Sequence, residues 1–185
     1  SGKKGLILDL LNNPGGLLSV TIDIADEFLD SGTVLSERER DGSERAFAAR
    51  SGGVATEIPV VILLNRFSAS GSEVLSAALH DNGRATIVGE KSFGKGTVNI
   101  SNSLDDGGQL YVSIAHWLTP KGAQINGVGI RPDVPVQFSD EDIDLRRDVQ
   151  LFKAIDILRG TDFTPASALT PQPEPSAEAT QPAGG

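Results

Sequence analysis

Residues 59–75, PVVILLNRFSASGSEVL, join an apolar run to a serine-rich turn and then to a helical pattern. Pro59–Leu64 is short and continuously apolar, which is typical of a strand that is buried on both faces. Small polar residues follow, and a helix is expected from Ser72 to His80. This stretch therefore predicts a strand, a turn and a helix in succession, which is the repeating unit of an α/β layer.

The same alternation continues on both sides of this unit. A strand is expected from Gly5 to Leu11, a helix from Leu17 to Leu29, and a further strand from Ala85 to Val88. Strands and helices in this order predict an α/β fold with an at least partly parallel sheet, and a β-rich part after it. The Asp41-Gly42 pair is a hairpin-type turn between two weaker strands. The weaker strand candidates are 33–35, 46–49, 98–100 and 110–115.

The last quarter of the chain divides into a helix and a polar tail. Ser139 followed by three acidic residues predicts a helix start, and Gly160 predicts its end. Residues 161–185 contain little that could be buried and are expected to be disordered. We therefore expect an α/β core over 1–138, an amphipathic helix over 139–160 and the tail. The expected apolar face of the helix consists of Leu145, Val149, Phe152, Ile155 and Leu158.

Composition excludes several classes of function. The 185 residues carry a net charge of −9, which disfavours nucleic acid and anionic lipid as partners. Cysteine is absent and there are only two histidines, so disulfides, thiolate chemistry and a histidine-rich metal site are excluded, and no metal or cofactor is predicted. No apolar run approaches the ~20 residues that span a bilayer. The chain lacks methionine, even at position 1, and we expect it to be a piece of a longer protein.

Two glycine- and serine-containing turns could carry chemistry. Asn12–Gly16 could direct backbone N–H groups at an anion or oxyanion, or it could simply be a sharp turn. In Ser68–Glu73, Ser70 and Glu73 fit a capping box. The functional alternative makes Ser70 a nucleophile at the start of a helix, although no Gly-x-Ser-x-Gly elbow is present.

A third segment, Gly89–Thr97, nearly matches a phosphate-binding loop. Gly96 stands where that loop needs a hydroxyl for magnesium, and the residues that follow resemble a strand rather than a helix. Nucleotide hydrolysis is therefore disfavoured, and a solvated lysine in a glycine turn remains an alternative. His80 could simply favour a helix C-terminus, and His116, beside a tryptophan, is expected to be packed rather than catalytic.

Three stretches, in their order, resemble the C-terminal processing peptidases, also called tail-specific proteases. They are LILDLLNNPGG (6–16), the run from 59 to 98, and LTPKGAQINGVGIRPDVPV (118–136). The resemblance implies a serine endopeptidase that cleaves proteins near their C-termini, with a core similar to the ClpP and crotonase folds. It also implies a bacterial envelope or periplasmic location, and a preceding PDZ domain with part of the core. A membrane-associated or adaptor partner could act through that preceding part.

The resemblance also assigns roles to residues. The middle serine of Ser-Ala-Ser, Ser70, is the nucleophile, and the lysine of Phe-Gly-Lys-Gly, Lys95, is the general base. A lysine serves as a base only when it is neutral, which calls for an enclosed site. We expect the glycines on both sides of Lys95 to let the backbone pack tightly and to bring the amine into such a site. The backbone N–H groups of Gly16 and Gly71 would form the oxyanion hole.

Supporting roles fall to Asp81 and to Asn99, which stands where the family commonly has glutamine. Leu11 replaces the usual arginine, and Gly71 replaces the usual alanine. These departures leave open a relative that binds peptide through the same core without cutting it. A third alternative, an acyl-CoA enzyme of the crotonase type, leaves the spacing between Ser70 and Lys95 without a purpose.

Overall fold

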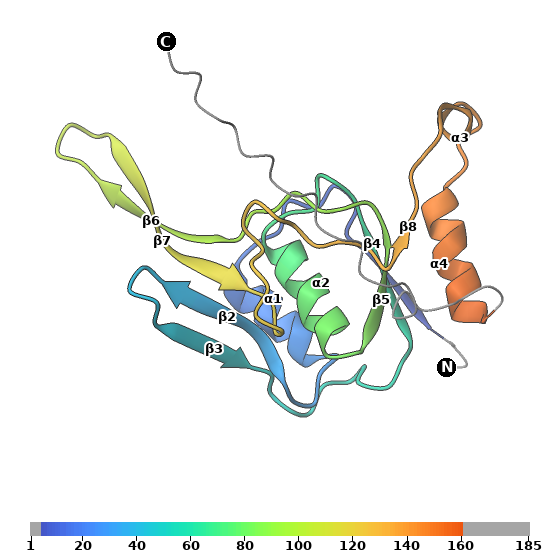
Figure 1. The fold of residues 1–185 in the computed structure, drawn as a ribbon, viewed down its shortest axis with the longest axis horizontal. Helices are drawn as coiled ribbons and strands as arrows, with labels where there is room; N and C mark the ends of the chain where they lie inside the picture. The colour runs from blue at the N-terminus through green and yellow to red at the C-terminus, as the bar shows by residue number, and fades with distance from the viewer. Residues whose placement is uncertain (1–4, 161–185) are drawn as a thin grey trace, which may run out of the picture.

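The computed structural model describes residues 5–160, which form two sheets and four helices (Figure 1). The elements in chain order are β1 (Leu6–Asp9), α1 (Leu18–Asp26), β2 (Thr33–Glu39), β3 (Glu44–Ala48), β4 (Val60–Leu64), α2 (Gly71–Asp81), β5 (Ala85–Gly89), β6 (Thr97–Ser103), β7 (Gln109–Leu118), β8 (Val134–Pro135), α3 (Asp140–Asp144) and α4 (Val149–Arg159).

The first sheet is parallel and has the strand order β1-β4-β5-β8. All five residues of β4 are buried, as expected for a central strand that is covered on both faces. Leu6 pairs with Val60, and Val60 pairs with Ala85, so the three long strands end at the same edge. The predicted α/β fold with a partly parallel sheet is confirmed.

The second sheet is antiparallel and has the strand order β3-β2-β7-β6. The expected hairpin around Asp41-Gly42 joins β2 to β3, and a second hairpin joins β6 to β7. The β6–β7 hairpin projects away from the rest of the molecule (Figure 1). The predicted β-rich part is therefore present, although β2 and β3 contribute to it from earlier in the chain.

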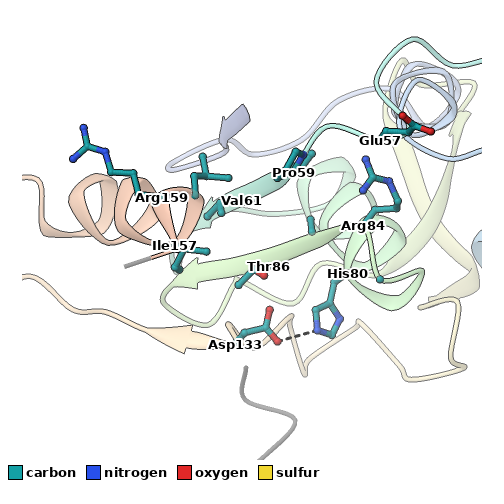
Figure 2. A pocket seen from close by; sticks show the side chains of 14 residues that line it. Glu57, Pro59, Val61, His80, Arg84, Thr86, Asp133, Ile157 and Arg159 are labelled. Carbon is teal, nitrogen blue, oxygen red and sulfur yellow. Dashed lines mark hydrogen bonds and ion pairs between the residues drawn. The ribbon is translucent and has the colours of Figure 1, made fainter. Parts of the chain in front are cut away.

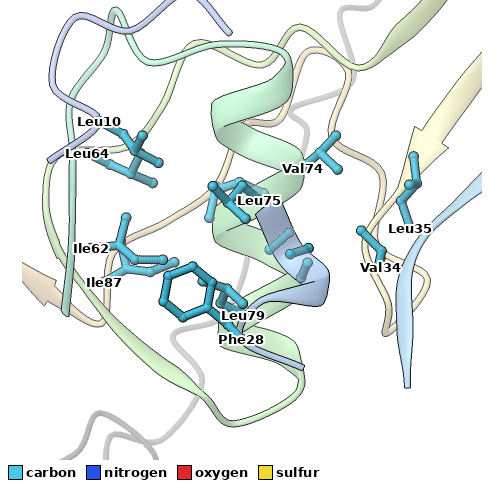
Figure 3. Packing of buried hydrophobic residues seen from close by; sticks show 14 of the residues in the cluster. Leu10, Phe28, Val34, Leu35, Ile62, Leu64, Val74, Leu75, Leu79 and Ile87 are labelled. Carbon is cyan, nitrogen blue, oxygen red and sulfur yellow. The ribbon is translucent and has the colours of Figure 1, made fainter. Parts of the chain in front are cut away.

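Helix α2 lies in the centre of the core, between the two sheets. Leu75 and Leu79 lie on the side of β4 and β5, where Ile62 and Ile87 are also found, and Val74 lies on the side of β2 (Figure 3). Nine residues of α2 are buried, so the helix is enclosed on nearly all sides. This burial fixes the position of the turn at its amino end, because the helix cannot move without disrupting the core.

The other face of the parallel sheet is covered by α4. Val61, Leu63 and Val88 point to this face and pack with Ala154. Alternate residues of β4 thus pack against α2 and α4, which follows from the two-residue period of a strand. The parallel sheet is consequently the middle layer between these helices.

The single helix expected over 139–160 was wrong. The structure has two helices there, because Arg146 adopts a positive φ of 51° and the Asp148 side chain caps a new helix by accepting from Leu151 N–H at 2.9 Å. The expected apolar face was also partly wrong: Phe152 is exposed, whereas Gln150 is buried. Gly160 ends α4 with a φ of 72°, as predicted. The disordered tail expected over 161–185 lies outside the described residues.

Candidate active site

Ser70 lies on a strained turn between β4 and α2. Its backbone angles, φ 56° and ψ −118°, are in a region that only glycine adopts readily. Such a conformation costs about 1–3 kcal/mol and persists where surrounding contacts fix it. Here the Ser70 N–H donates to Glu73 Oε2 at 2.9 Å, and the Ala69 N–H donates to the Asn13 carbonyl at 3.0 Å. A serine on a strained strand-to-helix turn is the arrangement of a nucleophile elbow, even without its usual glycine pattern.

The Gly15-Gly16 turn packs directly against the backbone around Ser70. A Cβ at Gly15, whose φ is 90°, would lie 2.5 Å from Gly71 N and 2.6 Å from Ala69 O. A Cβ at Gly71 would lie 3.1 Å from Gly16 N. The two predicted oxyanion residues are therefore brought together, and among residues 5–160 neither N–H has a hydrogen-bond acceptor. Glycine is needed here because the two backbones approach too closely for side chains.

Glu73 connects the nucleophile turn to the lysine loop. This side chain is fully buried, and each carboxylate oxygen accepts two hydrogen bonds. Oε2 accepts from Ser70 N–H at 2.9 Å and from Lys95 N–H at 2.8 Å. Oε1 accepts from the Ser92 hydroxyl at 2.5 Å and from Gly94 N–H at 2.6 Å. The backbones of Ser70 and Lys95 are consequently held side by side by one carboxylate oxygen.

Sequence reasoning assigned Glu73 only to a capping box. That hydrogen bond to Ser70 N–H is present, but the residue also binds a segment about twenty positions downstream. One feature of the sequence could have indicated this role: Glu73 stands on a helix that follows a buried strand and is apolar on several sides. A carboxylate buried there requires several hydrogen-bond donors, and these can only come from another segment.

The lysine loop itself is closely packed on both sides of Lys95. A Cβ at Gly94 would lie 3.1 Å from Gly129 N, and one at Gly96 would lie 2.5 Å from Asn126 N. The expectation that glycines allow tight packing here is confirmed. The expectation that Lys95 is enclosed is wrong, because its side chain is exposed. Its backbone is fixed beside Ser70, but among the described residues its amine has no hydrogen-bond or ion-pair partner.

The two predicted supporting residues do not contact Lys95 through hydrogen bonds. Asn99, on β6, accepts from the Ser113 hydroxyl at 2.6 Å and donates to Thr97 Oγ1 at 3.2 Å. Asp81 lies at the far end of α2 from Ser70, roughly 16 Å away at 1.5 Å per helical residue. It accepts from the Lys121 N–H at 3.1 Å and so positions a distant turn.

His80 binds two carboxylates at that far end of α2. Its Nδ1 lies 3.0 Å from Asp81 Oδ1. Its Nε2 lies 3.0 Å from Asp133 Oδ1 (Figure 2). Hydrogen bonds to Asp133 and then Asp81 raise the pKa of His80 to about 9, against the opposing effect of burial. Burial raises the pKa of each carboxyl, but hydrogen bonds from His80 and from backbone N–H groups outweigh it, so both pKa values lie below the usual one.

His80 and Asp133 line a cavity of about 680 Å³ at the amino ends of β4 and β5 (Figure 2). Ser70 and the glycine turns lie beyond the carboxyl ends of the parallel strands, so this cavity is at the opposite edge of the sheet from them. The role proposed for His80, a favourable charge at the end of α2, agrees with its place there. His116 is exposed on β7, so the expectation that it is packed was wrong.

The part of the chain that the structure describes has neither a metal-binding cluster nor a membrane-spanning helix. No group of three or more histidine, cysteine, aspartate or glutamate side chains in this part of the chain could hold a metal ion. Within the same range, every helix is too short or too polar to cross a membrane.

Known proteins resemble this chain over most of its described length. Residues 1–136 match the profile of Peptidase family S41. The carboxyl-terminal-processing protease of Synechocystis sp. is 44% identical over 162 residues, which is 86% of this chain and 38% of that protein. Carboxyl-terminal-processing peptidase 3, chloroplastic, of Arabidopsis thaliana is 45% identical over 132 residues, 71% of this chain and 25% of that protein. The chain thus spans well under half of the length of these relatives.

A solved structure has the same fold. The photosystem II D1 C-terminal processing protease superimposes with a TM-score of 0.70 at 38% identity, covering 74% of this chain and 35% of that one. Because the family profile matches from residue 1 to residue 136, it includes the Gly15-Gly16 turn, the Ser70 turn and the lysine loop. The chain therefore belongs to peptidase family S41, the family of the carboxyl-terminal-processing proteases.

Proposed function

We propose that this chain carries the catalytic core of a serine endopeptidase that cleaves proteins near their C-termini. Ser70 is the nucleophile, Lys95 is the general base, and the N–H groups of Gly16 and Gly71 form the oxyanion hole. Family membership supports a serine peptidase, and the relatives named for carboxyl-terminal processing support the preference for C-termini.

The observation that carries the proposal is the shared hydrogen bonding of Glu73 Oε2. Because this oxygen accepts from both Ser70 N–H and Lys95 N–H, the two nitrogens are separated by no more than the sum of two hydrogen-bond lengths. A lysine side chain is long enough to cover that separation and reach a serine hydroxyl. The unpaired N–H groups of Gly16 and Gly71 lie on two turns that pack together beside Ser70, where negative charge would develop.

The chemistry follows from these positions. Ser70 Oγ attacks the carbonyl carbon of the scissile peptide bond while its proton passes to the neutral amine of Lys95. The carbonyl oxygen becomes an oxyanion that accepts from the Gly16 and Gly71 N–H groups. Lys95 then gives its proton to the departing amine, which leaves an acyl ester on Ser70. Water hydrolyses the ester by the same two proton transfers in reverse.

Substrate binding has a second task in this scheme, because Lys95 is exposed before a peptide binds. A peptide that covers the amine removes water from it, and this favours the neutral form that a base requires. Because the backbone of Lys95 is already held by Glu73, only its side chain has to rotate for the amine to reach Ser70. Lys95 therefore becomes an effective base only when a substrate peptide is bound.

The exposed Lys95 and the pairing of Asn99 with Ser113 favour one alternative function. In that alternative the same surface binds peptides without cutting them. Both functions take protein segments as ligands, and neither requires a cofactor. By analogy with bacterial and chloroplastic relatives we also propose an envelope or other extracytoplasmic location, with activation through parts of the complete protein outside this chain.

Peptide cleavage by the complete protein that contains this chain decides between the two functions. Ser70→Ala and Lys95→Ala should each lower kcat by about a thousandfold or more, since each removes one member of the nucleophile–base pair. Lys91→Ala is the matched control, because Lys91 is another exposed lysine of the same loop. Unchanged activity in Lys95→Ala would exclude the proposed base, and a wild-type protein that binds peptides but cuts none would favour the alternative.

A further inference from the structure

One face of α1 exposes apolar side chains that no described part of the molecule covers. Leu17, Val20 and Ile24 are 72%, 49% and 39% exposed. Their spacing of three and four residues places them along one side of the helix. Exposed apolar side chains in a row on one helix face are characteristic of a surface that binds another molecule.

This face borders a groove of about 170 Å³ that begins at the candidate oxyanion hole. Val20 and Ile24 line the groove from α1, and Leu10 and Leu75 line it from the core. Its other residues are uncharged and include both Gly16 and Gly71. The same glycines that present the two free N–H groups therefore also border an apolar groove.

Resting on the proposed function, we propose that this groove binds the side chain of the residue whose carbonyl is attacked, and that Val20 and Ile24 select aliphatic side chains there. A carbonyl oxygen that accepts from Gly16 and Gly71 N–H lies at the rim of the groove. The α-carbon of the same residue is only one carbon further away, so its side chain is adjacent to the groove. No other side chain of the substrate is held so close to these two glycines by the chemistry.

The size and lining of the groove determine which side chains it accepts. An aliphatic-lined cavity of about 150 Å³ accepts a molecule the size of benzene, so this groove has room for a leucine, isoleucine or valine side chain. A charged side chain would lose its water here without gaining an ion-pair partner, because the lining is uncharged. Cleavage should therefore follow aliphatic residues and avoid aspartate, glutamate, lysine and arginine.

Gly71 packs closely against α1 because it has no Cβ. A Cβ there would lie 2.6 Å from Thr21 Oγ1, and the Thr21 hydroxyl is held by donating to the Leu17 carbonyl at 3.1 Å. Thr21 is one turn of α1 away from Ile24 and lines the same groove. The groove and the oxyanion donors are consequently parts of one packed unit.

The test compares kcat/KM for peptides that differ only in the residue before the cut, using alanine, valine, leucine, aspartate and lysine. The complete protein is compared with Val20→Phe, which narrows the groove, and Val20→Asp, which adds a negative charge. Val54→Asp is the matched control, because Val54 is 91% exposed and does not line the groove. Each variant is also checked for an unchanged melting temperature.

We expect the leucine-to-alanine ratio of kcat/KM to fall about tenfold or more in Val20→Phe, since a pocket distinguishes a methylene by about that factor. In Val20→Asp the lysine-to-leucine ratio should rise by at least tenfold, while Val54→Asp keeps the wild-type ratios. If all ratios stay unchanged in both Val20 variants, or only the residue after the cut changes its preference, the inference is wrong although the peptidase function stands. If the folded wild-type protein cuts no peptide, the proposed function fails and the inference fails with it.

Discussion

Replacing Glu73 with glutamine tests whether this buried carboxylate holds the two catalytic segments together. The substitution keeps the length of the side chain and replaces one acceptor oxygen with an NH₂ group. Each oxygen of Glu73 accepts two hydrogen bonds, so the NH₂ group must face two donors in either orientation. Facing Ser70 N–H and Lys95 N–H, it would leave both without an acceptor.

The opposite orientation costs less. The NH₂ group then faces the Ser92 hydroxyl, which can turn to accept from it, and only Gly94 N–H is left without an acceptor. One unsatisfied buried N–H costs about 1–3 kcal/mol, and replacing charged by neutral hydrogen bonds adds to this. The free energy of unfolding should therefore fall by about 3 kcal/mol, which is a large share of the total for a domain of this size.

Urea unfolding of the wild type, Glu73→Gln and Glu57→Gln measures this effect. Glu57 is an exposed glutamate for which the same change removes no described hydrogen bond. Below the melting temperature of every variant, kcat should fall in Glu73→Gln and stay unchanged in Glu57→Gln, because only the former loosens the turn and the loop. A Glu73→Gln protein within about 0.5 kcal/mol of the wild type, with full activity, would refute this reasoning.

Two further predictions concern pH and packing. Because the folded-state pKa of His80 is raised from 6.5 to about 9, its stabilising contribution is complete below pH 6.5 and is lost as the pH rises through 9. Melting temperatures measured from pH 6 to 10 should show this loss in the wild type and in the exposed-site control His116→Gln, but not in His80→Gln; equal slopes in all three would contradict it. Gly71→Ala should cost about 1–3 kcal/mol, since its Cβ would lie 2.6 Å from Thr21 Oγ1. Thr21→Ala in the same chain should recover most of that loss in urea unfolding, and purely additive losses would show that another contact is responsible.

The sequence predicted the elements whose signals are local. The apolar run that became β4 and the helical spacing of α2 gave their bounds to within about a residue. Gly16 and Gly71 were assigned to one oxyanion hole through the family resemblance, and both lie in glycine-containing turns that follow strands. The parallel sheet brings those turns to one edge, and this made the site predictable as a set of segments.

What could not be predicted depends on contacts between distant segments. Glu73 matches a capping box, and nothing near it in the sequence indicates that Gly94 and Lys95 donate to it. The exposure of Lys95 is equally invisible, because the same glycine-flanked lysine could be enclosed or solvated. The break before α4 depends on the positive φ of Arg146, which a pattern of apolar spacing does not register.

A crystal structure of the complete protein with a bound peptide would give the decisive quantity for the proposed nucleophile–base pair, which is the distance between Ser70 Oγ and Lys95 Nζ. A wild-type site occupied by a peptide analogue that cannot be cleaved would preserve both the serine hydroxyl and the lysine amine. We expect Lys95 to turn from solvent to within about 3.2 Å of the serine oxygen when the peptide covers it. A peptide seated on Gly16 and Gly71 while Lys95 still points into water, out of reach of Ser70, would contradict it.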